Sequence, residues 1–153
     1  MAQRKITRTA QWKLTAEYVL DIATDTVYDL TSGTVIDLKT TTLANGAKVA
    51  AIALPNNAVI EAGRMNVLTA FDHGGAVTAA IGDSVNTARY LAATSLKTLG
   101  ITPIVATEYQ GLGNPLSLLI AAAGANGTVG KVRFTIDFTI PGRANEITHY
   151  QPN

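Results

Sequence analysis

Cysteine is absent from the sequence, and charged residues are scarce. With no cysteine among its 153 residues, the chain can form neither disulfides nor thiolate metal sites. Charged residues make up 15% of the chain, against about 25% in an ordinary soluble protein. Either neighbouring molecules cover part of the surface, or Thr, Ser, Asn and Gln supply the polarity of a monomer, and the composition leaves both open.

An excess of positive charge is missing as well. The formal net charge is +1, whereas a nucleic-acid groove requires a clustered excess of Lys and Arg. The basic residues near the N-terminus, Arg4, Lys5 and Arg8, are too sparse for such a groove. We expect them to be solvated or to face a protein partner. The composition therefore predicts no nucleic-acid partner.

The sequence has no long apolar segment. The longest apolar run, residues 116–123, contains a serine and is far shorter than the ~20 residues of a membrane-spanning helix. The N-terminus lacks the apolar stretch of a secretion signal. We expect no membrane partner, and a chain that folds in a reducing cytoplasm. Its length suffices to bury a core without disulfides or a metal.

Residues suited to catalysis are not grouped in a recognised pattern. His73 follows Asp72 in the glycine-rich segment 71–75, but adjacent side chains in a turn generally diverge, and we predict a solvent-exposed turn there. No serine stands in a Gly-x-Ser-x-Gly elbow. Segment 111–115 lacks the Lys-Ser/Thr of a phosphate loop. We predict a protein that is not an enzyme, with no catalytic residue, metal site or cofactor.

Alternation of apolar and polar residues is the main pattern that the sequence does contain. Residues 131–140 alternate with the period of two expected of a strand with one buried face. Residues 6–20 alternate almost as strictly, but fully extended they would span roughly 50 Å, longer than a strand of a small domain. That segment either bends partway or leaves the domain as an arm. We divide the chain into an N-terminal extended arm or strand, residues 1–25, and a β-sandwich domain, residues 26–153.

Turn signals separate the remaining elements. Residues 26–30 and 34–38 are joined by three residues ending in Gly33, which predicts a bulged hairpin. Residues 83–99 favour a helix, because apolar residues recur there at spacings of three and four, although Tyr90 and Leu91 form a short strand in the alternative interpretation. With eight or nine strands in all, the sequence predicts an all-β fold. It is a β-sandwich, with a jelly roll as the favoured arrangement and at most one short helix.

Several segments of the sequence form an ordered set. They are LPNNAVI at 54–60, LTAFD at 68–72, IGD at 81–83, RYL at 89–91, and the stretch from GTVGKV to IPGR at 127–143. The set resembles small virion structural proteins of tailed bacteriophages, of the capsid decoration, cement or head-fibre type. The resemblance covers about residues 54–143 and has no counterpart in the first fifty residues.

The resemblance implies a function on the virion. It implies a protein that decorates or cements the capsid shell by binding the major capsid protein and its own neighbours. Such a protein would be a homo-oligomer, plausibly a trimer, on the capsid surface, assembled in the bacterial host cytoplasm. The alternatives are a head-fibre, neck or tail component, or a carbohydrate- or receptor-binding module at a fibre or tail tip. An enzyme that uses His73 ranks third.

Contacts with partners are expected in the N-terminal segment and in two loops, residues 72–75 and 110–115. An extended arm can add a strand to the sheet edge of a neighbour, and many weak contacts repeated over a shell act strongly together. The candidate interaction residues are Ile6, Arg8, Trp12, Leu14, Tyr18, His73, Leu112 and Asn114.

Overall fold

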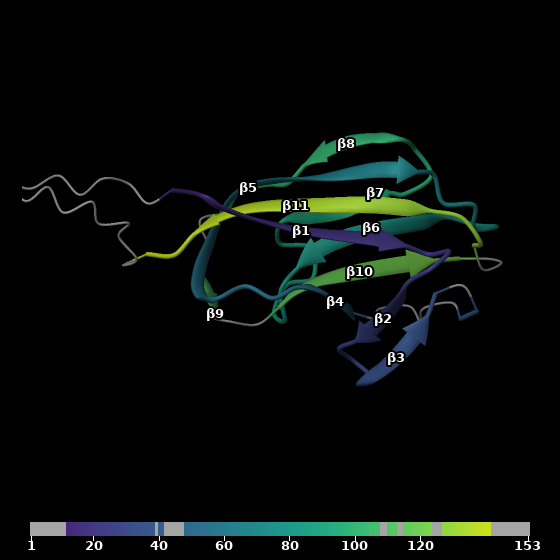
Figure 1. The fold of residues 1–153 in the computed structure, drawn as a ribbon, viewed down its shortest axis with the longest axis horizontal. Helices are drawn as coiled ribbons and strands as arrows, with labels where there is room; N and C mark the ends of the chain where they lie inside the picture. The colour runs from purple at the N-terminus through teal and green to yellow at the C-terminus, as the bar shows by residue number, and fades with distance from the viewer. Residues whose placement is uncertain are drawn as a thin grey trace, which may run out of the picture.

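The computed structural model describes residues 12–38, 40–41, 48–107, 110–112, 115–123 and 127–141. Within these ranges the chain forms eleven β-strands and no helix. The strands make two antiparallel sheets that pack face to face, as Figure 1 shows. The predicted all-β sandwich is thus confirmed. The described part of the chain also contains no helix long and apolar enough to span a membrane.

The first sheet has five strands. In spatial order they are β1 (Leu14–Asp21), β11 (Lys131–Thr139), β5 (Asn56–Thr69) and β8 (Gly100–Pro103), and β9 (Gln110–Leu112) also pairs with β5. β1 is paired with β11 along its whole length, from Leu14 opposite Phe138 to Asp21 opposite Lys131. The N-terminal segment predicted as residues 1–25 therefore includes an edge strand of this sheet, and its residues 1–11 lie outside the described ranges.

The second sheet has six strands. In spatial order they are β3 (Thr34–Asp37), β2 (Thr26–Asp29), β4 (Lys48–Ile52), β10 (Leu116–Ala122), β6 (Val77–Gly82) and β7 (Leu91–Ser95). β2 and β3 form the predicted hairpin, with Thr26 opposite Asp37 and Asp29 opposite Thr34. The connection has four residues, 30–33, instead of the predicted three, and the register is regular, without the predicted bulge. Gly33 has a φ of 70° in the connecting turn, a conformation that glycine adopts without steric cost.

The core lies between the two sheets and follows the alternation seen in the sequence. On β11, Val132, Phe134, Ile136 and Phe138 are buried. Phe134 and Ile136 line a residual cavity of about 10 Å³ together with side chains of the second sheet, among them Ile81 and Leu118. A space of this size is at the limit for one water molecule. The interior is therefore filled by side chains and has no room for an organic ligand at this place.

The helix predicted for residues 83–99 is wrong. Residues 83–90 form a loop and β7 follows it, so the alternative interpretation, a short strand at Tyr90 and Leu91, is partly confirmed because Leu91 begins β7. The Asp83 carboxylate accepts hydrogen bonds from the backbone N–H groups of Val85 and Asn86, each at 2.8 Å. Such side-chain bonds compete with a helical hydrogen-bond ladder. The backbone of β7 pairs with β6 instead.

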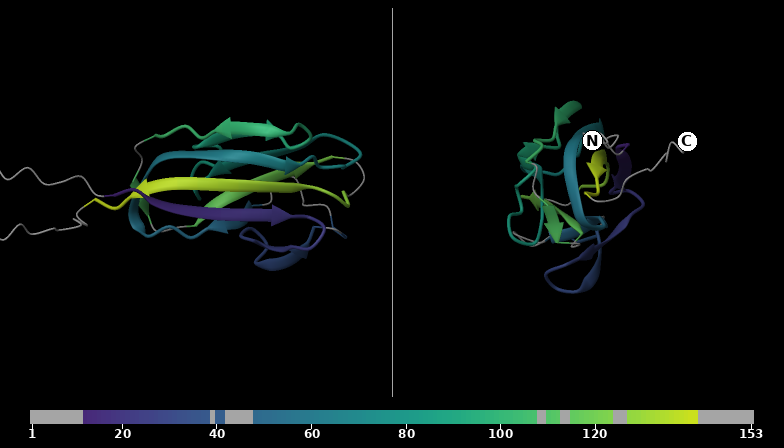
Figure 2. Two further views of the ribbon diagram at one scale, coloured as in Figure 1. Left: turned by 45° about the horizontal axis from the view of Figure 1, so that its top comes forward. Right: turned by 90° about the vertical axis from the view of Figure 1, so that its left-hand side faces the viewer.

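The two ends of the described domain lie side by side. Because Leu14 is opposite Phe138 in an antiparallel pair, β1 begins where β11 ends, as the views in Figure 2 show. At the far end of the same strands, the N–H of Ile22 donates to the carbonyl of Gly130 at 3.0 Å. The residues just before β1 and just after β11 thus lie at one end of the first sheet, and the residues that follow β1 and precede β11 lie at the other.

Candidate interaction surfaces

The outer face of the first sheet carries charged side chains that pair across β1 and β11. The Lys131 Nζ lies 3.2 Å from Asp21 Oδ2, and the Arg133 Nε lies 3.6 Å from Glu17 Oε1. Hydrogen bonding from Ala23 and Lys131 lowers the pKa of Asp21. All four side chains are partly exposed, and exposed ion pairs contribute little to stability. This face is therefore suited to contact with water.

An open depression lies on this face where the chain ends emerge. It has a volume of about 470 Å³ and is lined by Lys13, Glu61, Thr139 and Pro141, among others. Glu61 accepts a hydrogen bond from Thr139 Oγ1 at 2.7 Å and pairs with Lys13 Nζ at 3.1 Å. These two contacts lower the pKa of Glu61. Both carboxylate oxygens are already bound by the chain's own side chains.

The outer face of the second sheet is composed differently. Since Leu118 lies opposite Val49 and Ile81 in the core, the alternate positions of β4, β6 and β10 point outward. Among the outward-facing residues in the described part of these three strands, one is charged: Lys48, at the start of β4. The others are small or uncharged: Ala50, Thr78, Ala80, Gly82, Ser117, Leu119 and Ala121.

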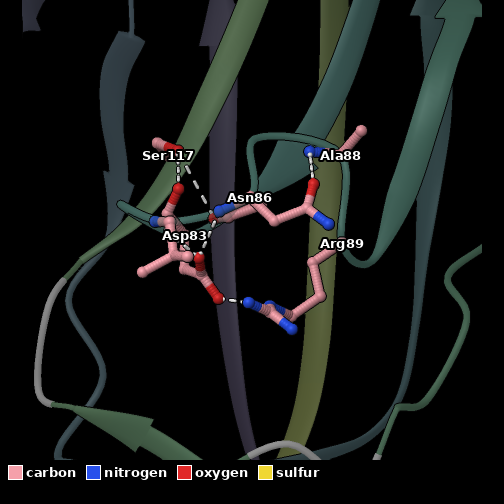
Figure 3. Close-up of polar contacts among 7 residues, drawn as sticks. Asp83, Asn86, Ala88, Arg89 and Ser117 are labelled. Atoms are coloured by element: carbon pink, nitrogen blue, oxygen red, sulfur yellow. Dashed lines mark hydrogen bonds and ion pairs between the residues drawn. The ribbon is translucent and has the colours of Figure 1, made fainter.

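The loop of residues 83–89 covers one end of that face and is fastened by Asp83 (Figure 3). Besides the N–H groups of Val85 and Asn86, the carboxylate binds the Arg89 Nε at 2.5 Å. Burial alone would raise the pKa of Asp83, but the bonds from Asn86, Arg89 and Val85 outweigh it and lower the pKa. A Cβ at Gly82 would collide with the backbone of Asn86. The loop can therefore pack against the sheet only because residue 82 is a glycine.

His73 is buried, so the predicted solvent-exposed turn is wrong at this residue. Its ring stacks on Phe71, with ring centroids 6.0 Å apart, and its Nδ1 has no hydrogen-bond partner. Burial lowers the pKa of His73, with Lys97 adding to the effect and Asp72 opposing it. The ring is buried because Gly127 lies against it: a Cβ there would come within 2.4 Å of Nδ1.

Asp72 acts on the neighbouring His73 through its charge, and its carboxylate anchors the segment that leads into β11. Its carboxylate accepts hydrogen bonds from the backbone N–H of Val129 at 3.0 Å and from the Thr128 hydroxyl and N–H at 2.8 Å each. These bonds lower the pKa of Asp72 to about 2. The geometry is that of a loop anchor. In the described ranges no group of three or more His, Asp or Glu side chains is placed to hold a metal ion.

The candidate residues named from the sequence do not form one site. Trp12 and Leu14 are exposed where β1 begins, whereas Tyr18 is half-buried and stacks on Phe134, with ring centroids 6.5 Å apart. His73 lies at the opposite end of the first sheet, after β5. Leu112 is in β9. Three further candidates, Ile6, Arg8 and Asn114, lie outside the described residues.

Two exposed apolar groups were not anticipated from the sequence. The hairpin patch consists of Tyr28 on β2, Leu30 in the turn and Val35 on β3. The β8 patch consists of Leu68, Leu99, Ile101 and Val105. The sequence does contain a signal for the hairpin patch. Val27-Tyr28 and Val35-Ile36 are adjacent apolar pairs, and neighbours in a strand point to opposite faces, so one member of each pair has to face outward.

No protein-family model matches the sequence, and a search of curated proteins finds no match either. The structure, in contrast, is similar to chains in solved phage capsids. A chain of the cyanophage Pam1 capsid asymmetric unit matches with a TM-score of 0.59 and 15% identity, over 92% of this chain and 96% of that one. A chain of the Ralstonia phage GP4 capsid matches with a TM-score of 0.57 and 16% identity, over 93% of both chains.

A third match is to the acidic stable capsid structure of Helicobacter pylori bacteriophage KHP30, with a TM-score of 0.57 and 11% identity. It covers 88% of this chain and 93% of that one. At these identities the likeness establishes a shared fold, and the coverage shows that the fold is shared over nearly the whole of each chain. The predicted resemblance to phage structural proteins is confirmed at the level of the fold.

Proposed function

We propose that this protein is a structural component of a bacteriophage virion that decorates or cements the capsid shell. The observation that carries the proposal is the coverage of the structural matches. Each match spans 88–93% of this chain and 93–96% of a chain from a phage capsid structure. A common substructure of two or three strands would match only part of each chain. The correspondence is instead between whole chains of similar size.

The strand order supports a jelly roll as the finer description of the fold. When β9 and the β2–β3 hairpin are set aside, the sheets read β1-β11-β5-β8 and β4-β10-β6-β7. Numbered along the chain, these eight strands lie in the orders 1-8-3-6 and 2-7-4-5. This is the interleaved order of two Greek keys in a double-sheet jelly roll, an arrangement common in viral capsid domains. The hairpin is then an insertion between the first two strands.

The proposed partners are the major capsid protein and neighbouring copies of this chain. The low charge and the exposed hairpin and β8 patches support contacts with other proteins. A homo-oligomer, such as a trimer, on the outer surface of the shell would repeat each contact many times, so that weak single contacts act strongly together. Assembly would take place in the cytoplasm of the bacterial host.

The other virion locations, in a head fibre, neck or tail, are compatible with the same fold. A carbohydrate-binding tip has less support from the surface. The exposed aromatic side chains Trp12 and Tyr28 belong to different sheets, the first before β1 and the second on the hairpin. They do not form a common platform on which a sugar would stack.

A reconstitution experiment tests the proposal. Capsids assembled without this protein are mixed with the purified chain, and the occupancy and the temperature of shell disruption are measured. We expect saturable, stoichiometric binding, a higher disruption temperature, and protein density on the outer shell in an electron-microscopy reconstruction. Absence of binding, or density confined to the tail tip together with binding on a glycan array, would overturn the decoration role.

A further inference from the structure

The outward positions of β8 are apolar, in contrast to those of β11 in the same sheet. Ile101 and Pro103 of β8 lie opposite Asn66 and Arg64 of β5. Because Met65, between these two β5 residues, is buried, the four side chains point to the outer face of the sheet. On β11, polar residues face outward and apolar residues face the core. The polarity of β8 is thus the reverse of what burial inside one isolated molecule requires.

The β8 patch is open to solvent. Three of its four side chains are 63–64% exposed, and the fourth, Leu68, is 38% exposed. The two segments that surround the patch, residues 62–69 and 96–107, belong entirely to the described part of the chain. Exposed apolar side chains that are grouped, as opposed to scattered singly, indicate a surface that another molecule covers.

The charges around the patch are basic. Arg64 and Lys97 are the charged residues of these two segments, and both are exposed. The Lys97 Nζ donates a hydrogen bond to the carbonyl of His73 at 2.6 Å, which holds the amino group beside the end of the sheet. A partner that complements this surface therefore presents apolar side chains together with negative charge.

Arg64 is the cation best placed to meet such a partner. It lies opposite Pro103, beside the patch, and it forms no ion pair with another described residue. It lines an open depression of about 360 Å³ together with Asp137, but the Asp137 carboxylate accepts a hydrogen bond from the Thr15 hydroxyl at 2.8 Å. A carboxylate on the partner can thus pair with Arg64 while apolar side chains cover the patch.

The size of the patch favours a contact repeated over a shell, not a stable pair of free molecules. Residues 99–105 extend over about 23 Å at ~3.3 Å per residue, and two strands are about 10 Å wide. The resulting area, roughly 230 Å², is far below the ~800 Å² that each partner contributes to a stable complex. Two copies of the patch would also bring like charges together. A contact this small acts strongly when many copies bind one lattice.

We propose that the β8 patch and Arg64 bind the capsid shell, at a place where the shell protein presents apolar side chains beside a carboxylate. This contact rests on the proposed function and names the surface that carries it. Pro103, at the end of β8, has no N–H to donate, so side chains make the contact and no strand is added. The hairpin patch lies on the opposite side of the sandwich (Figure 1) and takes no part in it.

Binding of the full-length protein to shells assembled without it tests this assignment. Occupancy is measured at several salt concentrations for the wild type, I101S, L99S/I101S and R64Q, and urea denaturation checks that each variant is folded. We expect I101S to weaken shell binding about tenfold, and the double variant to weaken it further. R64Q should weaken binding about tenfold at low salt and remove most of its salt dependence.

Matched variants control for unspecific effects. V35S removes a side chain that is 69% exposed on the hairpin, and R133Q removes another cation from the outer face of the first sheet. Both should bind shells like the wild type. If I101S, L99S/I101S and R64Q also bind like the wild type, the decoration role stands and the assignment of this surface is wrong. A wild type that does not bind shells overturns the proposed function and this contact together.

The absence of cysteine allows the partner to be identified directly. In I101C the introduced thiol is the sole one in the chain, so a photoreactive label attached to it reports what lies next to β8. We expect crosslinks to the shell protein in decorated particles. Crosslinks to another copy of this chain, or self-association of the free protein that is lost in L99S/I101S, would assign the patch to contacts between copies and overturn the inference.

Discussion

The ion pairs of the first sheet are exposed to solvent, whereas the ion pair beside the second sheet is largely buried. On the first sheet, the paired side chains of Glu17 and Arg133 are 49% and 44% exposed. Beside the second sheet, Asp83 and Arg89 are 12% and 20% exposed, and the same carboxylate also binds two backbone N–H groups. The exposed pairs keep the outer face of the first sheet hydrated, and the buried pair holds the loop of residues 83–89 in place. Burial, not the number of pairs, decides what each contributes.

The largest effect tests whether the two sheets share one core despite their different outer faces. Phe134→Ala in the first sheet and Leu118→Ala in the second each remove a fully buried side chain. We expect losses in the free energy of unfolding of about 3–5 and 2–5 kcal/mol respectively, measured by urea denaturation. A cost below about 1 kcal/mol for either one would mean that its sheet does not depend on the shared core.

The second-largest effect tests whether the buried ion pair beside the second sheet contributes more to stability than the exposed pairs of the first sheet. Asp83→Ala removes the acceptor of three hydrogen bonds and the carboxylate that pairs with the Arg89 guanidinium, so we expect a loss in the free energy of unfolding of about 2–4 kcal/mol. Asp83→Asn keeps an oxygen for the backbone N–H groups and should cost less. If Asp83→Ala unfolds at the same denaturant concentration as the wild type, the buried pair is no more important than the exposed ones.

A third test extends the comparison to a buried polar group at the end of the first sheet. Because burial lowers the pKa of His73, the folded protein binds fewer protons than the unfolded chain below pH ~6.5. Stability should therefore fall as the pH is lowered from about 6.5 to the pKa of the folded state. Unfolding free energies measured at several pH values should show this slope in the wild type and lose it in His73→Gln.

The control for this slope is His149→Gln, which changes the other histidine of the sequence. It should keep the pH dependence of the wild type. A slope that persists in His73→Gln would show that another group titrates in this range.

The smallest effect is expected on the exposed face. Glu17→Gln removes the charge that faces Arg133 across β1 and β11 and should lower the free energy of unfolding by about 0.5 kcal/mol or less. The difference from the wild type should vanish when the salt concentration is raised. A loss as large as that of Asp83→Ala would contradict the distinction between the two sheets.

Local patterns predicted the parts of the fold that local chemistry controls. The alternation of residues 131–140 gave the buried and exposed sides of β11, because a strand with one buried face has a period of two. The hairpin followed from Gly33 and its flanking residues. The helix over residues 83–99 was wrong because the spacing of its apolar residues is also compatible with a loop, and Asp83 binds the backbone of that loop.

Features that depend on distant residues were not accessible from the sequence. His73 is buried by Gly127, and Asp72 binds Thr128, more than fifty residues away. No local sequence pattern predicts contacts between residues so far apart in the chain. The candidate surfaces depend likewise on which strands lie at a sheet edge. The place of β3 at an edge of the second sheet, for example, follows from the strand order, which one sequence does not specify.

The chain ends leave the sandwich side by side, because β1 and β11 are antiparallel neighbours. Lys13, just before β1, and Ile140, just after β11, therefore belong to the same pole of the molecule. A short covalent bridge between residues near these two positions would close the described backbone into a ring without crossing the sandwich.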